Sequence, residues 1–147
     1  GAKLVNTNGV HKDSLTNSYV DVLMIENMTC HYLPDDMDIH FPNLNHIDVT
    51  NTGLKVLTKK NMKMFPHIKY LYIRRNSIEH LPSKLFEHNQ KLQFINFSDN
   101  KIKHIDADVF DDISSLISVN LERNDCIDMS VYNDVAALKA QILNKCL

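Results

Sequence analysis

Equivalent apolar residues recur along this 147-residue chain at a fixed interval of 24 positions. Leu44, Ile68, Leu92 and Leu116 form one such column. Three further apolar columns keep the same step: Ile47, Leu71, Ile95 and Val119; Val49, Ile73, Phe97 and Leu121; Leu54, Ile78, Ile102 and Cys126. A period of roughly 20 to 50 residues predicts a stack of similar units, each of which buries its apolar face against its neighbours.

Within one unit, apolar and polar residues alternate as they do in a half-buried strand. Leu71 and Ile73 alternate with Tyr70, Tyr72 and Arg74. One short strand cannot bury its own apolar face, whereas strands stacked about 4.8 Å apart form a continuous parallel sheet with a shared core. A polar column follows the strand at the same interval: Thr52, Asn76, Asn100 and Asn124. The side-chain amides of its asparagines are expected to form hydrogen bonds with backbone groups where the chain turns out of the strand.

The clearest unit runs from residue 68 to residue 81 and reads I-K-Y-L-Y-I-R-R-N-S-I-E-H-L. It resembles the leucine-rich-repeat family, whose signature is L-x-x-L-x-L-x-x-N-x-L. Asn100 and Asn124 match the signature asparagine, whereas Thr52 and Met28 depart from it. The resemblance covers about residues 20–146. It implies an α/β leucine-rich-repeat solenoid, with a curved parallel sheet on the concave side and short helical or irregular turns on the convex side.

We expect three regions: an amino-terminal cap over residues 1–19, five repeats over 20–129 and a helical cap over 130–147. Caps are needed because a solenoid otherwise exposes apolar ends. Asn8-Gly9 lies between apolar residues, which predicts a hairpin in the amino-terminal cap. The carboxyl-terminal cap places Val135, Leu138, Ile142 and Cys146 on one helical face, after a capping residue that is either Asn133 or Asp134.

Two of the three cysteines lie in this carboxyl-terminal region. Cys126 holds an inward repeat position and Cys146 ends the helix, so we predict a Cys126–Cys146 disulfide that fixes the helix over the last repeat; the alternative is two unrelated thiols. The order N-x-C-I-D, helix, cysteine resembles the cap of secreted insect leucine-rich-repeat proteins, which include immune proteins from mosquitoes. Cys30 shares its column with Leu54 and Ile78, which favours a buried, inert thiol; a bond to a cysteine outside this sequence is the alternative.

Composition and charge argue against several classes of protein. The net charge of -2 and the pI of about 6.5 give no basic surface for nucleic acid. No apolar run approaches the roughly 20 residues that a membrane span needs. Gly1-Ala2-Lys3 is not followed by an apolar core, so we expect no signal peptide within the sequence.

Nothing in the motifs predicts catalysis, a metal or a cofactor. The eight histidines show no ligand spacing such as H-E-x-x-H, although His80 and His104 share a column and are expected to stack on adjacent turns. We therefore expect structural or solvated histidines. The acidic group Asp106, Asp108, Asp111 and Asp112 lacks the glycine of a calcium loop, and no G-x-S-x-G nucleophile motif occurs. The sequence predicts a protein without enzymatic activity.

The outward positions of the predicted sheet carry an unusual set of side chains. Aromatic and arginine residues gather on the central strands, which is the composition of a binding hot spot. The alternative is that cross-strand aromatics only stabilise the sheet. The protein-binding residues predicted on this face are His46, Tyr70, Tyr72, Arg74, Arg75 and Phe94. Replacing Tyr72 or Arg74 with alanine is expected to weaken partner binding with little change in thermal unfolding.

We therefore expect a secreted recognition module that binds a protein partner in insect innate immunity or related extracellular recognition. Asn27-Met28-Thr29 and Asn96-Phe97-Ser98 are candidate glycosylation sites of such a protein, with Asn27 favoured because Asn96 falls in a predicted strand. Two alternatives remain: a structural or adhesive module that self-associates as a homodimer, and an intracellular leucine-rich-repeat scaffold.

Overall fold

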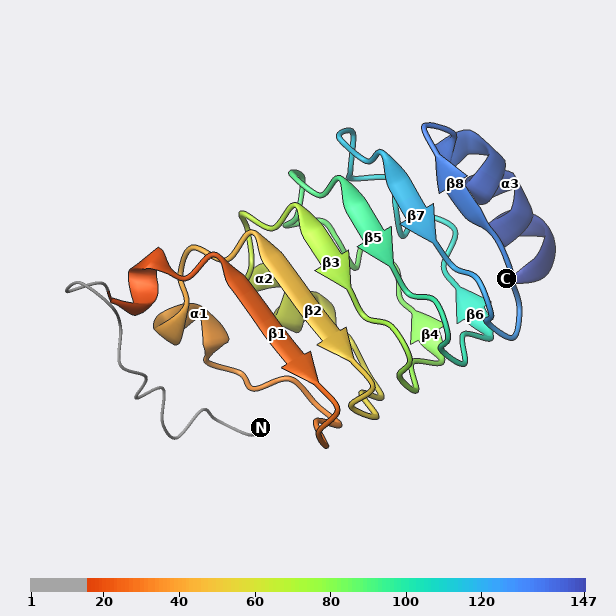
Figure 1. Cartoon of the computed structure of the whole chain (residues 1–147). Coiled ribbons are helices and arrows are strands. Elements are labelled where there is room, and N and C mark those ends of the chain that lie inside the picture. Colours follow the sequence, from red (N-terminus) through yellow and green to blue (C-terminus); the bar gives the residue numbers. More distant parts are fainter. Residues whose placement is uncertain (1–15) are drawn as a thin grey trace.

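The 24-residue interval is the register of a curved parallel sheet in the computed structural model, which describes residues 16–147 (Figure 1). Within that range the sheet has six strands, in the order β1-β2-β3-β5-β7-β8. The parallel strands are β1 (Val22–Glu26), β2 (His46–Thr50), β3 (Tyr70–Tyr72), β5 (Phe94–Asn96) and β7 (Ser118–Asn120). Each residue pairs with the one 24 positions later, as in His46 with Tyr70 and Tyr70 with Phe94. The chain is thus a solenoid, as predicted, and it has about four turns.

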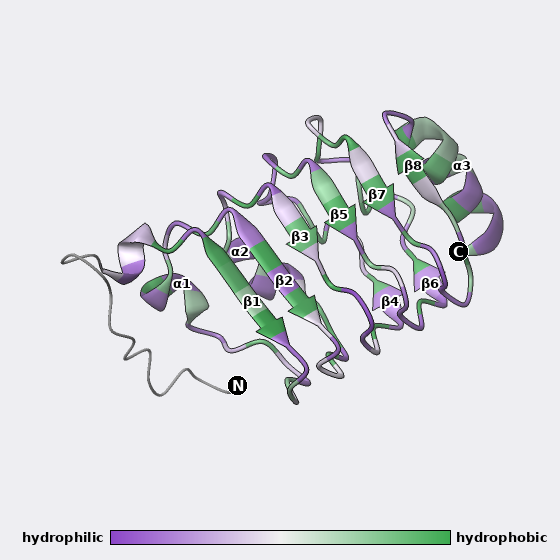
Figure 2. Cartoon of the chain, in the orientation of Figure 1, coloured by the Kyte–Doolittle hydropathy of each residue, from purple (hydrophilic) through white to green (hydrophobic). Residues whose placement is uncertain are grey.

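The alternation of side chains decides what the sheet buries. Ile47, Leu71, Ile95 and Val119 point inward from successive strands, and none is more than 2% exposed. The strand at the amino-terminal edge differs, because Leu23 and Ile25 of β1 are only half-buried. Figure 2 shows β1 hydrophobic along most of its length.

The return half of each turn forms the convex wall that was predicted as short helices and irregular turns. Helix α1 (Met37–His40) and helix α2 (Lys59–Lys63) cover the first turns, and irregular turns replace them further along. Phe86 and Phe110 stack between adjacent windings, with ring centroids 5.9 Å apart. A second, two-stranded sheet pairs β4 (His80–Leu81) with β6 (His104–Ile105) in parallel. This small sheet lies apart from the large one (Figure 1).

The asparagine column closes the bend after each strand. Asn76 Oδ1 accepts hydrogen bonds from the backbone N–H groups of Thr52 and Leu54, at 3.0 and 3.2 Å. Asn76 Nδ2 donates to the carbonyl oxygen of Val49 at 2.7 Å. Buried backbone groups must be paired, and the asparagine pairs those of the preceding turn. Asn100 and Asn124 repeat the arrangement one and two turns later.

The expected departure at Thr52 is accommodated by the same network. The hydroxyl of Thr52 lies 2.9 Å from Asn76 Oδ1, and the Thr52 side chain is buried. The same hydroxyl also lies 3.4 Å from the carbonyl oxygen of Cys30, so Thr52 contacts both the next asparagine of the column and the preceding turn.

A second column, not anticipated from the sequence, turns the chain just after each strand. Asn27, Asn51, Arg75, Asp99 and Arg123 have positive φ values between 53° and 56°. Asparagine and aspartate tolerate the left-handed region, whereas for arginine it costs on the order of 1 kcal/mol. The recurrence at five equivalent positions of the described chain shows that the winding itself imposes this conformation.

The carboxyl-terminal cap combines an antiparallel strand with a helix. Strand β8 (Ser130–Tyr132) pairs antiparallel with β7, an element that the helical pattern did not predict. Helix α3 (Val135–Lys145) follows, and Asp134 caps it by accepting a hydrogen bond from the Ala137 N–H at 3.1 Å. Leu138, Ile142 and Cys146 are buried, as expected.

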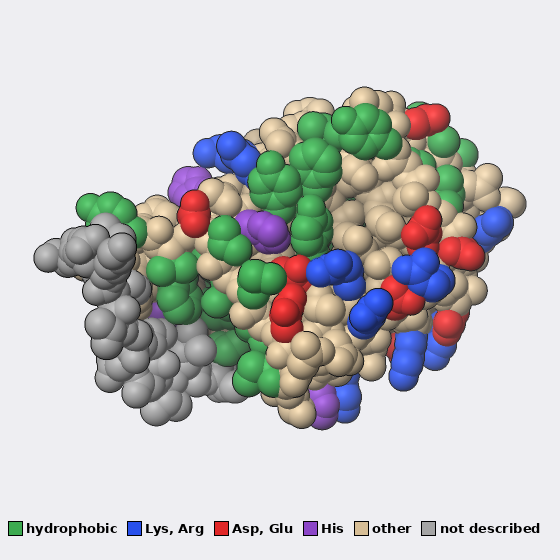
Figure 3. All heavy atoms as spheres, viewed as in Figure 1, with side chains coloured by type: hydrophobic (Ala, Val, Ile, Leu, Met, Phe, Trp, Pro, Cys, Tyr) green, Lys and Arg blue, Asp and Glu red, His purple; other side chains and the backbone are tan. Residues whose placement is uncertain are grey.

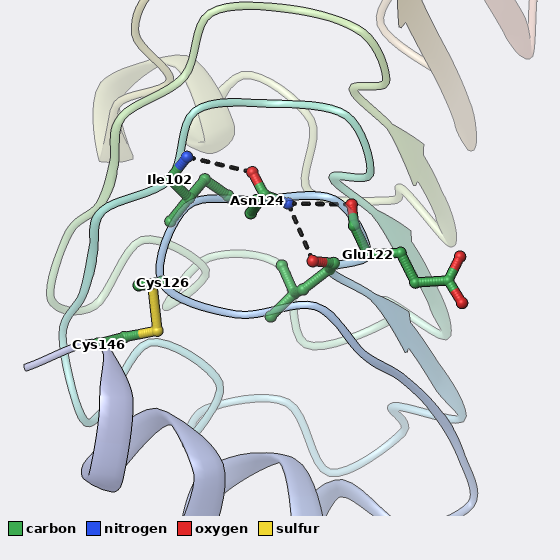
Figure 4. The surroundings of a disulfide bond; sticks show 6 residues. Ile102, Glu122, Asn124, Cys126 and Cys146 are labelled. Carbon is green, nitrogen blue, oxygen red and sulfur yellow. Dashed lines mark hydrogen bonds between the residues drawn. A yellow bond between two sulfur atoms is a disulfide. The ribbon is translucent and has the colours of Figure 1, made fainter.

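The predicted disulfide between Cys126 and Cys146 is present. Figure 4 shows it joining the end of α3 to the winding that Asn124 closes. Asn124 thus joins this winding to the preceding one, and the disulfide joins it to α3.

The amino-terminal hairpin predicted around Asn8-Gly9 lies outside the described residues. A 3-10 turn over Asn17–Tyr19 precedes β1. No helix within residues 16–147 is long and apolar enough to cross a membrane.

Candidate functional site

Four rings on the outward face of the large sheet contact one another across three strands. His46 of β2 lies 5.5 Å from Tyr70 and 5.1 Å from Tyr72, measured between ring centroids. Tyr70 stacks on Phe94 of β5 at 5.3 Å, with an angle of 7° between the planes. The contacts follow from register, because residues directly opposite in a parallel sheet stand about 5 Å apart. All four side chains remain partly accessible.

Arg74 extends this group of rings into a charged region. Its guanidinium carbon lies 5.6 Å from the centroid of the Tyr72 ring. Its Nη2 donates to Asp48 Oδ2 at 2.8 Å, and Thr50 Oγ1 donates to Asp48 Oδ1 at 2.5 Å. Asp48 is only 3% exposed, and these two donors compensate the burial of its carboxylate beneath the outward face of the sheet. We call His46, Tyr70, Tyr72, Phe94 and Arg74 the concave cluster.

Two nitrogens of the concave cluster are buried yet have no hydrogen-bond partner within the described residues: His46 Nε2 and Arg74 Nε. Unsatisfied buried donors and acceptors cost about 1–3 kcal/mol each.

Arg75, the sixth predicted binding residue, follows Arg74 and is not one of the contacting rings. It is exposed and belongs to the left-handed column at the end of the strands. Together with Arg74 it borders a shallow cavity of about 320 Å³. The other lining residues are Thr50, Asn96, Ser98, Asp99, Asn120 and Arg123.

Sequence reasoning missed the bidentate pair at the far side of this cavity. Arg123 donates from Nε and Nη2 to the two carboxylate oxygens of Asp99, at 2.6 and 2.8 Å. These hydrogen bonds lower the pKa of the Asp99 carboxyl below its usual value and raise the pKa of Arg123. Both residues come from the same column 24 positions apart, which is the signal that could have found them.

The face as a whole changes character along the solenoid. Figure 3, which views the outward side of the sheet, shows hydrophobic side chains gathered over β1 to β5 and charged ones beyond them. Val22 and Met24 of β1 continue the apolar part, at 42% and 58% exposure. The apolar and charged parts meet at Arg74.

The geometry alters one expectation about variants of this face. Removing the Arg74 side chain would leave the buried Asp48 carboxylate without its cation. Breaking an ion pair in which both partners are buried destabilises a protein by several kcal/mol. Because the Arg74 side chain is 39% exposed, we discount the loss to about 1–3 kcal/mol. Arg74→Ala therefore perturbs the scaffold as well as the surface, and the tyrosines are the cleaner probes.

The remaining predicted positions lie away from the concave cluster. Asn27 is exposed, with its Oδ1 accepting from Asn51 Nδ2, whereas Asn96 is half-buried in β5 and accepts from the Ser98 N–H. Cys30 is an unpaired, half-buried thiol, and burial raises its pKa. His80 and His104 are adjacent, as the shared column predicted, with ring centroids 4.8 Å apart on the small sheet.

These features define a solenoid repeat protein whose curved sheet offers an ordered, partly aromatic face. The chain belongs to the leucine-rich-repeat family. The family profile, described as Leucine rich repeat, matches residues 42–96 and 66–125, which together span more than half of the chain. Domains of this family are generally protein-binding modules and typically lack catalytic activity. A comparison with curated proteins finds no match.

Proposed function

We propose that this leucine-rich-repeat domain is a secreted recognition module that binds a protein partner through the concave cluster. We further propose that it acts in insect innate immunity or related extracellular recognition. The partner would cover the apolar part of the face with its own apolar surface and offer an acceptor near Arg74.

The observation that carries the proposal is that the rings of the concave cluster already contact one another in the free protein. Rings that already touch lose little conformational freedom on binding, so a larger share of the contact free energy appears as affinity. Aromatic and arginine side chains at the centre of a face are also those that dominate binding energies in measured interfaces.

Secretion is supported by the Cys126–Cys146 disulfide, because such bonds persist in oxidising compartments. Glycosylation at Asn27 is consistent with that setting, since this sequon asparagine is exposed at the rim of the sheet. The insect immune role rests on the resemblance of the carboxyl-terminal cap to secreted insect proteins.

The experiment compares partner capture by the wild-type chain and by a Tyr70→Ala/Tyr72→Ala variant. Each protein is immobilised and exposed to insect haemolymph, and the affinity for any captured protein is then measured with purified components. We expect at least about a tenfold loss of affinity, since hot-spot truncations cost more than about 1 kcal/mol each.

Tyr32→Ala provides the matched control, because Tyr32 is an exposed tyrosine on the segment after β1. It should bind the partner like the wild type. A double variant that binds equally well, or that loses binding only in proportion to its unfolding midpoint, would contradict the proposal.

Self-association is a second candidate function, favoured by the exposed apolar side chains of the first turn. Val22, Met24 and Met28 are 42%, 58% and 59% exposed. Sedimentation over a wide range of concentrations separates the two functions. A monomer throughout supports binding to a different protein, whereas a dimer that Met24→Lys abolishes supports self-association.

A further inference from the structure

We propose that His80, His104 and Asp106 form a binding site for a divalent transition-metal ion of the zinc class on the small β4–β6 sheet. The potential ligand atoms of these three residues all lie within 4.8 Å of one another. The Asp106 carboxylate contacts both rings, with Oδ2 at 3.2 Å from His80 Nε2 and Oδ1 at 2.8 Å from His104 Nε2. The two ring nitrogens therefore converge on one carboxylate.

The repeat brings the histidines together. His80 and His104 are register partners in the small sheet, as are the residues that follow them, Leu81 and Ile105. Leu81 and Ile105 are fully buried, which fixes both strands to the core. Because side chains alternate along a strand, both imidazoles must then project from the opposite side, next to each other.

The carboxylate of Asp106 also accepts a hydrogen bond from Ser83, a residue outside the trio. The backbone N–H of Ser83 donates to Asp106 Oδ2 at 2.6 Å, and the Ser83 hydroxyl donates to Asp108 Oδ2 at 2.9 Å. The Ser83 N–H thus orients the Asp106 carboxylate, and such outer contacts are what tune metal sites in proteins.

The distances suit a tetrahedral ion. Zinc binds imidazole nitrogen and carboxylate oxygen at about 2.0–2.2 Å, so neighbouring ligand atoms stand about 3.3 Å apart. The two nitrogen–oxygen separations, 3.2 and 2.8 Å to different oxygens of Asp106, are both shorter than this value, by at most about half an ångström. An ion entering between the three groups would require rotations of side chains that are 48%, 43% and 31% exposed, and its fourth position would be open to water.

The ligand set also selects the kind of metal. Imidazole nitrogen favours zinc, copper and nickel, whereas magnesium and calcium prefer sites made of oxygen ligands. Water and ions can reach the trio, because His80 and Ser83 also border an open groove of about 850 Å³. The small sheet is separate from the large one that carries the concave cluster, so this proposal stands apart from the proposed function.

The test is a calorimetric titration of Zn²⁺ into the full chain without a polyhistidine tag, with Mg²⁺ titrated in parallel. We expect one Zn²⁺ per chain and no heat from Mg²⁺. His80→Gln should weaken Zn²⁺ binding at least about tenfold, since even the loss of an outer contact costs that much. Its side chain is 48% exposed, so circular dichroism should show an intact fold. Asp106→Asn, which keeps an acceptor for Ser83, should weaken binding as well.

His67→Gln is the matched control, because His67 is an exposed histidine outside the trio, with its Nδ1 3.5 Å from Lys91 Nζ. It should bind Zn²⁺ like the wild type. Absorption of bound Co²⁺ gives a second readout, because its visible bands report the geometry of nitrogen and oxygen ligands. Wild type that binds no Zn²⁺, or a His80→Gln variant that binds it equally well, overturns the proposal and leaves the trio as a hydrogen-bonded stack.

Discussion

Single asparagines hold adjacent windings of this solenoid together. Asn76 serves three buried backbone groups of the preceding turn, which no apolar residue of the same size could do. The sequence column predicted this role, because only a side chain with both a donor and an acceptor suits a bend that is closed on all sides.

Asn76→Ala should lower the free energy of unfolding by at least about 2 kcal/mol, because it leaves buried N–H groups of Thr52 and Leu54 without an acceptor. Urea denaturation measures the loss. Asn144→Ala, at an exposed position of α3, should change stability by less than about 0.5 kcal/mol. Equal stability of the two variants would show that water replaces the asparagine at no cost.

The binding residues were only partly predictable at this scale. Alternation placed Tyr70, Tyr72 and Phe94 outward, and register brought them into contact. The ion pair between Arg74 and Asp48 was not foreseen, because a column of residues 24 apart does not contain partners 26 apart. Side-chain length, which lets an arginine reach diagonally across strands, decides such contacts.

At the scale of elements, the carboxyl-terminal cap shows which signals a sequence carries. The helical spacing predicted α3, and the two cysteines predicted the bond that fixes it. Strand β8 escaped prediction, because three residues are too few to show a period. Pairing with the exposed edge of β7 is what makes these residues a strand.

Removing the disulfide should destabilise the whole chain and not only its cap. The bond closes a loop of 20 residues, for which chain entropy gives about 3 kcal/mol. We therefore expect Cys126→Ala to lower the free energy of unfolding by about 3 kcal/mol in urea denaturation. Cys30→Ala, which removes the unpaired thiol, should cost less than half as much. A smaller loss in Cys126→Ala than in Cys30→Ala would mean that packing alone holds α3.

The molecule as a whole is quasi-one-dimensional, because each turn contacts only the turns beside it. A residue in the middle of the stack is therefore enclosed by two neighbours, and one in the first turn is less enclosed. Leu71 of β3 is 1% exposed, whereas Leu23 of β1 is half-buried at the equivalent inward position.

The same substitution should then have different effects along the stack. Leu71→Ala should cost about 3–5 kcal/mol, in the range measured for buried leucines, whereas Leu23→Ala should cost about 1–2 kcal/mol. Denaturation curves of the two variants provide the comparison. Equal losses would show that the first turn is enclosed as fully as the central ones.

From the sequence alone one could deduce the solenoid, its 24-residue winding, the inward columns, the outward aromatics and the disulfide. All of these except the disulfide repeat along the chain, so the period of side chains suffices to reveal them. The disulfide follows from two cysteines, one at an inward position of the last repeat and one at the end of the helical pattern. Only the tertiary structure decided the left-handed column, the Arg74–Asp48 and Arg123–Asp99 pairs, strand β8 and the meeting of His80 and His104 with Asp106. These features depend on how far side chains reach between windings and on which edges remain to be paired, and both are settled by packing in space.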